Sequence, residues 1–141
     1  MADSAPRKVH NDTPYKAISR DTNGLYSLLK FNTPPGGGPP LHCHANEDEG
    51  FYVVEGIYRF WVGDAAPVDV YPGAHVFGPR GIFHRFQNIS DMPGEMLIIF
   101  SPAGCENYFM ELAAVREAGG KDVIKKERAV DQKYGITINR G

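Results

Sequence analysis

The segment that decides the fold is GGGPPLHCHANEDEGFYVVEG, which runs from Gly36 to Gly56. His42 and His44 stand two residues apart, so in an extended strand both side chains point to the same face, about 6.6 Å apart along the chain. Glu49 follows at the start of a β-rich run that Gly56 closes. The spacing therefore predicts that two imidazoles and one carboxylate face the same interior.

A second segment, GAHVFGPRGIFHRFQN over residues 73–88, contributes a third histidine. Pro79 and Gly81 occupy the positions that a type I turn prefers, and His84 opens the strand that follows the turn. A purely structural role gives no reason to place three histidines at the starts of strands that turns define. We therefore expect His84 to join the other two histidines and the carboxylate.

Three imidazoles and one carboxylate form a nitrogen-rich ligand set. Such a set suits one divalent transition metal ion, which is iron, manganese, nickel, cobalt, copper or zinc, and does not suit calcium or magnesium. In six-coordinate geometry two positions stay open, where substrate and dioxygen can bind together. The predicted cofactor is one such metal ion.

The rest of the chain is divided into short β-rich runs by its 16 glycines and 11 prolines. Eight runs of strand length with turn residues between them favour an all-β sandwich or barrel. The predicted strands cover residues 24–32, 41–43, 50–55, 57–62, 68–71, 75–77, 84–88 and 95–100. After Pro102 the composition predicts a helix over 104–118, a weaker helix over 123–134 and a short strand over 136–138.

A length of 141 residues with 42% apolar and 23% charged residues indicates one globular domain. We divide it into an N-terminal arm (1–19), a barrel (about 20–103) and a helical tail (104–141). A net charge of -2 argues against nucleic acid as a partner, and no apolar run is long enough to span a membrane. The first residues lack the apolar block of a signal peptide, so we expect a cytoplasmic protein with Cys43 and Cys105 as free thiols.

Both segments follow the two sequence motifs of the cupin superfamily. The first motif, Gly-x5-His-x-His-x4-Glu-x6-Gly, and the second, Gly-x5-Pro-x-Gly-x2-His-x3-Asn, match at every defined position. The chain thus resembles a cupin over residues 24–103, which implies a small double-stranded β-helix, or jelly-roll barrel, and metal ligation by His42, His44, Glu49 and His84. Residues 31–42 and 100–106 are similar to single-domain proteins described as quercetin dioxygenase-like.

Strand alternation predicts which side chains share the interior with Glu49. The expected substrate pocket consists of Phe51, Val53, Tyr58, Phe60, Phe86 and Phe77, with Val76 as the alternative to Phe77. Such aromatic walls fit a planar or polycyclic organic substrate better than a sugar or phosphate. His75 is either a further polar group near this pocket or a surface residue.

The same alternation turns Ile57, Arg59 and Trp61 outward and leaves an apolar patch. We interpret this patch as the interface of a homodimer. The alternatives are that the C-terminal helix covers it, or that Trp61 is merely half exposed.

Together these expectations predict a metal-dependent oxidoreductase. The predicted enzyme is a dioxygenase that acts on a small aromatic substrate or on a polyketide- or flavonol-like one. Glu49 would be both ligand and catalytic base. The first alternative is a non-redox isomerase or polyketide cyclase that uses the same residues. The second is a cupin that binds a small molecule without turning it over.

Overall fold

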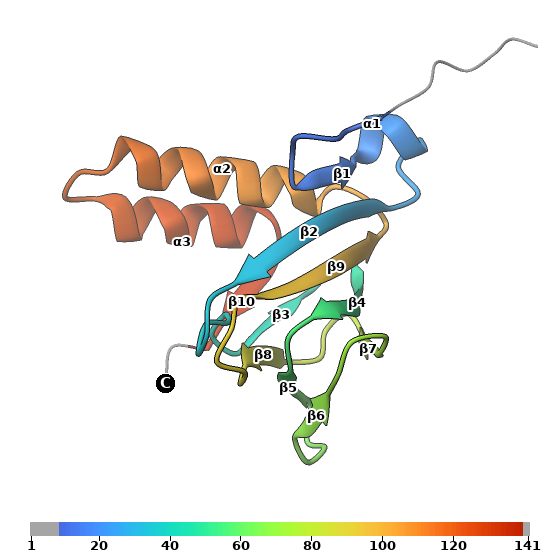
Figure 1. Ribbon diagram of the computed structural model, residues 1–141. Helices are drawn as coiled ribbons and strands as arrows, with labels where there is room; N and C mark the ends of the chain where they lie inside the picture. Colours follow the sequence, from blue (N-terminus) through green and yellow to red (C-terminus); the bar gives the residue numbers. More distant parts are fainter. Residues whose placement is uncertain (1–8, 140–141) are drawn as a thin grey trace, which may run out of the picture.

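The computed structural model describes residues 9–139, which form two five-stranded sheets and a helical hairpin (Figure 1). The first sheet has the order β1 (Tyr15–Ala17), β2 (Ser27–Thr33), β9 (Gly94–Ser101), β4 (Asp48–Glu55) and β7 (His75–Gly78). The second has the order β10 (Ile136–Ile138), β3 (His42–His44), β8 (His84–Asn88), β5 (Tyr58–Val62) and β6 (Val68–Val70). Neighbouring strands are antiparallel throughout. The predicted double-sheet, all-β architecture is confirmed.

The core lies between the two sheets and is rich in aromatic side chains. Phe51 of β4 meets Phe60 of β5 at a ring-centroid distance of 5.1 Å and Phe86 of β8 at 5.7 Å. Because alternate residues of a strand point to one face, Glu49 and Val53 are buried on the same side of β4 as Phe51. Each phenylalanine buried in this way contributes about 1.5–3 kcal/mol to the free energy of folding.

The C-terminal tail forms helices α2 (Cys105–Ala118) and α3 (Val123–Lys133) and then strand β10. Helix α2 ends where Gly119 and Gly120 both adopt positive φ angles. The Tyr108 hydroxyl of α2 donates a 2.7 Å hydrogen bond to Asp131 of α3, and this bond joins the two helices. Strand β10 pairs with β3, so the tail completes the second sheet beside the histidine-bearing strand. The predicted helices and final strand are confirmed, and α3 ends one residue earlier than expected.

The last residues of the expected N-terminal arm belong to the first sheet. Strand β1 pairs with β2 with Tyr15 opposite Leu29, and the short helix α1 (Ser19–Thr22) follows. The Tyr15 ring packs against the core, and the backbone N–H of Lys30 donates to the Pro14 carbonyl at 2.8 Å, which offsets the cost of ordering this polar segment. The part of the arm over residues 1–8 lies outside the described residues.

Cys43 and Cys105 are free thiols, as the sequence predicted. Between residues 9 and 139, no helix has the length and apolar character that crossing a membrane requires.

Candidate metal centre

Four side chains converge at one place between the two sheets. His42 and His44 come from β3 and His84 from β8, whereas Glu49 reaches them from β4 of the other sheet. His42 and His84 face each other directly in the strand register. One ligand atom from each of the four side chains lies within 4.8 Å of the others. The structure thus brings together the residues whose spacing indicated a metal site.

Backbone carbonyls orient two of the three imidazoles. Nδ1 of His42 lies 2.8 Å from the carbonyl oxygen of Pro40, and Nδ1 of His84 lies 3.2 Å from that of Ile82. A carbonyl oxygen only accepts, so each Nδ1 is placed to donate. Nε2 of each ring would then be the ligand atom, once a metal replaces the contact between Nε2 of His84 and Glu49.

Glu49 is held by imidazole nitrogens in a buried environment. Its Oε1 lies 2.9 Å from Nε2 of His84 and 3.3 Å from Nε2 of His44. The exposed fractions of the residues are 4% for Glu49, 1% for His84 and 2% for His44, so little water reaches this carboxylate. A buried charge is costly unless it is balanced, and a divalent cation in this position would balance it. The donor set and its geometry therefore fit a divalent transition metal ion.

The buried groups of the centre shift one another's pKa values. Burial, reinforced by the nearby His84, lowers the pKa of His42 to about 4. Burial also opposes charge on His44 and on Glu49, but hydrogen bonds outweigh it in both cases. Contacts with Cys105, Glu47 and Glu49 raise the pKa of His44 well above its usual range. Contacts with His44 and His84 lower the pKa of Glu49 well below its usual range. Without a metal, a neutral His42 therefore stands beside an ionic His44–Glu49 pair.

A cavity of about 770 Å³ reaches this centre. Its lining includes His42, His44 and Glu49, and it extends between β2, α2, β10 and the loop Gly38–Pro40. Most of the remaining walls are apolar or aromatic and consist of Tyr15, Leu29, Phe31, Phe86, Tyr108, Phe109, Leu112, Ile136 and Ile138. The arrangement gives an organic molecule access to three of the four candidate ligands.

The residues predicted to line the substrate pocket occupy different environments in the structure. Phe86 lines the cavity, as expected. Phe51, Val53, Tyr58 and Phe60 are fully buried and fill the core instead of lining the cavity. Strand alternation places a side chain on the inner face of a sheet, but only the packing of the opposite sheet decides whether that face is hollow or filled.

The prediction that Phe77 lines the pocket is wrong. Its side chain is 53% exposed, because β7 turns Val76 and Gly78 towards the inside and Phe77 outwards. Val76, the alternative, is half-buried and packs against the core. His75 shares the outer face with Phe77 and is a surface residue, one of its two predicted placements.

The cavity walls that were not predicted from the sequence come from β1, β2, α2 and β10. Phe31 follows Leu29 by two residues and so shares its face of β2, which strand alternation would have shown. Phe109 and Leu112 are three residues apart and share one face of α2. These two side chains face the barrel because of the way α2 docks on it, and no local sequence pattern predicts that docking.

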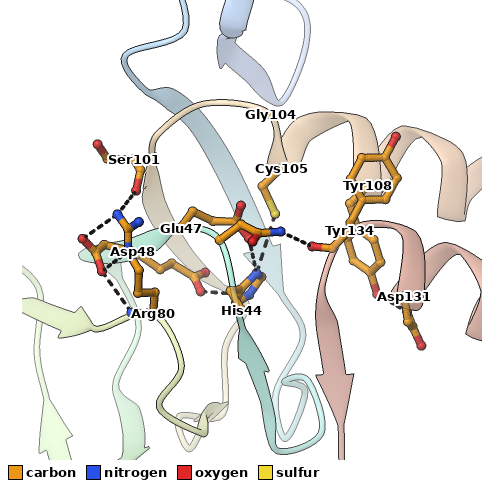
Figure 2. Close-up of polar contacts among 12 residues, drawn as sticks. His44, Glu47, Asp48, Arg80, Ser101, Gly104, Cys105, Tyr108, Asp131 and Tyr134 are labelled. Carbon is orange, nitrogen blue, oxygen red and sulfur yellow. Dashed lines mark hydrogen bonds and ion pairs between the residues drawn. The ribbon is translucent and has the colours of Figure 1, made fainter.

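Two further buried residues contact the centre without having been predicted. Glu47 places Oε1 3.0 Å from Nδ1 of His44, and Cys105 places Sγ 3.8 Å from the same nitrogen (Figure 2). Burial raises the pKa of the Cys105 thiol to about 11, so it is protonated at neutral pH. Glu47 and Glu49 are two residues apart, and this spacing was the available indication that both carboxylates face inward.

Solved structures with a similar fold are found for this chain. A sugar phosphate isomerase from Silicibacter pomeroyi DSS-3 is 22% identical, with 62% of this chain and 57% of that chain covered and a TM-score of 0.53. KdgF from Halomonas sp. is 16% identical, with coverages of 72% and 91% and a TM-score of 0.58. The DMSP lyase DddQ from Ruegeria pomeroyi DSS-3 is 26% identical, with coverages of 55% and 39% and a TM-score of 0.51.

A comparison with curated proteins finds no match. The cupin domain family pattern, in contrast, matches residues 29–100, which include β3 to β8, most of β2 and β9, and all four candidate ligands. With the double-stranded β architecture and the convergent histidines already described, this match shows that the chain belongs to the cupin domain family.

Proposed function

We propose that this cupin is a metal-dependent enzyme that binds one divalent transition metal ion through His42, His44, Glu49 and His84. The observation that carries the proposal is that these side chains converge and that three of them line the 770 Å³ cavity. A structural metal site is closed by protein ligands, whereas a catalytic site keeps positions open to substrate. The accessible cavity favours catalysis.

The cavity favours a small, largely apolar organic substrate. Aromatic walls from Phe31, Phe86 and Phe109 suit a planar ring system, and among the lining side chains Glu49 is the single carboxylate. The first candidate reaction is therefore oxygen insertion into an aromatic, polyketide- or flavonol-like substrate, in the manner of a quercetin dioxygenase-like cupin. A bound redox-capable ion would polarise the substrate oxygen and give electrons a route to dioxygen.

Glu49 has the position of a proton acceptor in this reaction. Glu49 lines the cavity, so a hydroxyl group placed beside the ligands would lie within hydrogen-bond reach of its carboxylate. The hydrogen bonds that depress its basicity come from Nε2 of His44 and His84, which are the same atoms that would serve as ligands. A bound ion would replace these two bonds and would itself lower the basicity of Glu49. Glu49 would therefore accept a proton from a substrate enol or phenol on leaving the ion as the substrate binds.

A non-redox isomerase or cyclase is the second candidate. The same carboxylate would move a proton between two carbons of a metal-polarised carbonyl compound. This candidate is favoured by the similarity to proteins described as a sugar phosphate isomerase and a lyase. The largely apolar walls suit a hydrocarbon ring, whereas Lys30 and Arg116, which also line the cavity, suit a phosphate group.

Oxygen uptake tests the proposal. Protein loaded with iron, manganese or nickel is incubated with flavonol-type substrates in an oxygen electrode, beside the variants Glu49→Gln and His84→Ala. We expect uptake by the wild type that both variants lose, while His75→Ala, which removes an exposed histidine, retains it. Turnover that continues under strict anaerobic conditions supports the isomerase or cyclase. A substrate that binds and is recovered unchanged, with every metal tested, contradicts catalysis.

A further inference from the structure

The three histidines of the metal centre differ in the hydrogen-bond partner of Nδ1, the ring nitrogen that faces away from the centre. Nδ1 of His42 and Nδ1 of His84 donate to backbone carbonyl oxygens, which are neutral acceptors. Nδ1 of His44 instead lies 3.0 Å from a carboxylate oxygen of Glu47. Of the three imidazoles, His44 is thus the one placed between two carboxylates, with Glu49 on its Nε2 side.

Packing alone does not explain the position of Glu47. Its side chain is 9% exposed, and burying a carboxylate costs free energy unless a hydrogen bond satisfies it. The next residue, Asp48, points the other way and forms an exposed pair with Arg80 and its backbone N–H (Figure 2). Cys105, at the start of α2, closes the space beside the imidazole on the Glu47 side. Of three consecutive acidic residues, Glu47 and Glu49 therefore point inward onto His44 and Asp48 points outward.

We propose that Glu47 is a positioning residue that accepts the Nδ1–H of His44 and so directs the Nε2 lone pair of His44 at the metal. The inference rests on the proposed function. A carboxylate that accepts this proton fixes the tautomer and the ring orientation, and it makes the imidazole a stronger electron donor than one bound to a carbonyl. His44 is accordingly the strongest of the three nitrogen donors.

The charge of Glu47 matters as much as its shape. Glu47→Gln keeps the size of the side chain and one carbonyl oxygen but removes the negative charge. The amide group also donates, so it stabilises the tautomer of His44 that has its lone pair on Nδ1, which is the wrong side. Loss of such an outer partner typically weakens metal binding by roughly 10- to 100-fold.

Titration of the metal-free protein with Co²⁺, followed by its visible absorption and by competition with a chelator, tests the proposal without an activity assay. The matched control is Asp48→Asn, which neutralises the neighbouring exposed carboxylate. We expect Glu47→Gln to raise the Kd for Co²⁺ by roughly 10- to 100-fold and to shift the visible bands, with Asp48→Asn unchanged. An unchanged Kd and spectrum in Glu47→Gln would overturn the proposal. Wild-type protein that binds no Co²⁺ overturns the proposed function itself.

A second measurement needs no variant and so does not depend on how Glu47→Gln folds. In wild-type protein loaded with Zn²⁺ and labelled with ¹⁵N-histidine, NMR reports which ring nitrogen binds the metal and which carries a proton. We expect His44 to bind through Nε2 and to show its Nδ1 proton further downfield than those of His42 and His84. Ligation through Nδ1, or an Nδ1 proton of His44 that resonates with the other two, contradicts the role of Glu47.

Discussion

At the scale of single residues, His44 and Glu49 form an ion pair that a metal must displace. The pKa of His44 is raised, so the metal-free protein carries its proton at neutral pH, whereas the pKa of His42 is about 4 and this histidine is already neutral. A metal ligand must be an unprotonated imidazole. Metal binding is therefore coupled to the release of the proton of His44.

This coupling predicts a pH dependence with a definite sign. Below the raised pKa of His44 the proton competes with the metal, so affinity rises with pH, by about tenfold per unit between pH 6 and 8 for one proton released. Calorimetric titration in buffers of different ionisation enthalpy measures the number of protons directly. Binding that releases no proton, with an affinity independent of pH in this range, would contradict the His44–Glu49 pair.

Phe51 and Phe77 were both expected to line the pocket, and their different exposures give a second prediction at this scale. Phe51 is fully buried among aromatic rings, so Phe51→Ala should lower the free energy of unfolding by about 3–5 kcal/mol. Phe77 is exposed, and Phe77→Ala should cost less than about 1 kcal/mol. Denaturant unfolding of the two variants provides the comparison. Equal losses would show that Phe77 also faces the interior.

At the scale of structural elements, the loop before β3 connects the cavity rim to the metal centre. Pro40 supplies the carbonyl that orients His42, and the loop is anchored because the N–H of Gly36 donates to the Asn88 carbonyl at 2.8 Å. At Gly38, a Cβ would lie 1.9 Å from the backbone oxygen of Phe86, which no side chain tolerates. The close approach of this loop to β8 thus requires glycine.

Gly38→Ala should therefore displace the loop and weaken metal binding as well as stability. Gly36→Ala is the matched control, because Gly36 also has a positive φ angle but nothing lies within 4 Å of its added Cβ. We expect the control to lose about 1 kcal/mol of stability and to bind metal normally. Thermal unfolding and metal titration of both variants test this. If the two variants bind metal equally well, the loop does not position His42.

The sequence predicted those elements and ligands whose causes are local. Turn residues and strand alternation placed the strands to within a few residues, and two motifs gave His42, His44 and His84. The cavity walls could not be predicted from the sequence, because Phe109 reaches the cavity only through the docking of α2 beside β2. Strand β1 was missed for the same reason, since three residues of a polar segment become a strand only when β2 supplies the hydrogen bonds.

At the scale of the whole molecule, the homodimer remains a prediction. On the outer face of β5, Trp61 is half-buried, one of the alternatives weighed for it, and the Arg85 guanidinium lies 3.8 Å from the centre of its ring. A second apolar surface lies on the outer face of the first sheet, where Tyr52, Phe77 and Ile99 are exposed. The two faces belong to different sheets, so separate variants distinguish them.

Light scattering gives the mass of each variant in solution. We expect two chains for the wild type and one chain for Trp61→Glu, because a charge placed in an apolar interface disrupts it. Phe77→Glu serves as the control and should stay dimeric. A wild-type mass of one chain contradicts the dimer, and dissociation by Phe77→Glu alone moves the interface to the first sheet.

The most direct test of the whole account is a crystal structure of the protein grown with Co²⁺ or Zn²⁺, with the ion located by its anomalous scattering. We expect one ion bound by Nε2 of His42, His44 and His84 and by a carboxylate oxygen of Glu49, with its remaining positions open to the cavity. An ion bound elsewhere, imidazoles that point away from one another, or an ion enclosed entirely by protein atoms would contradict it.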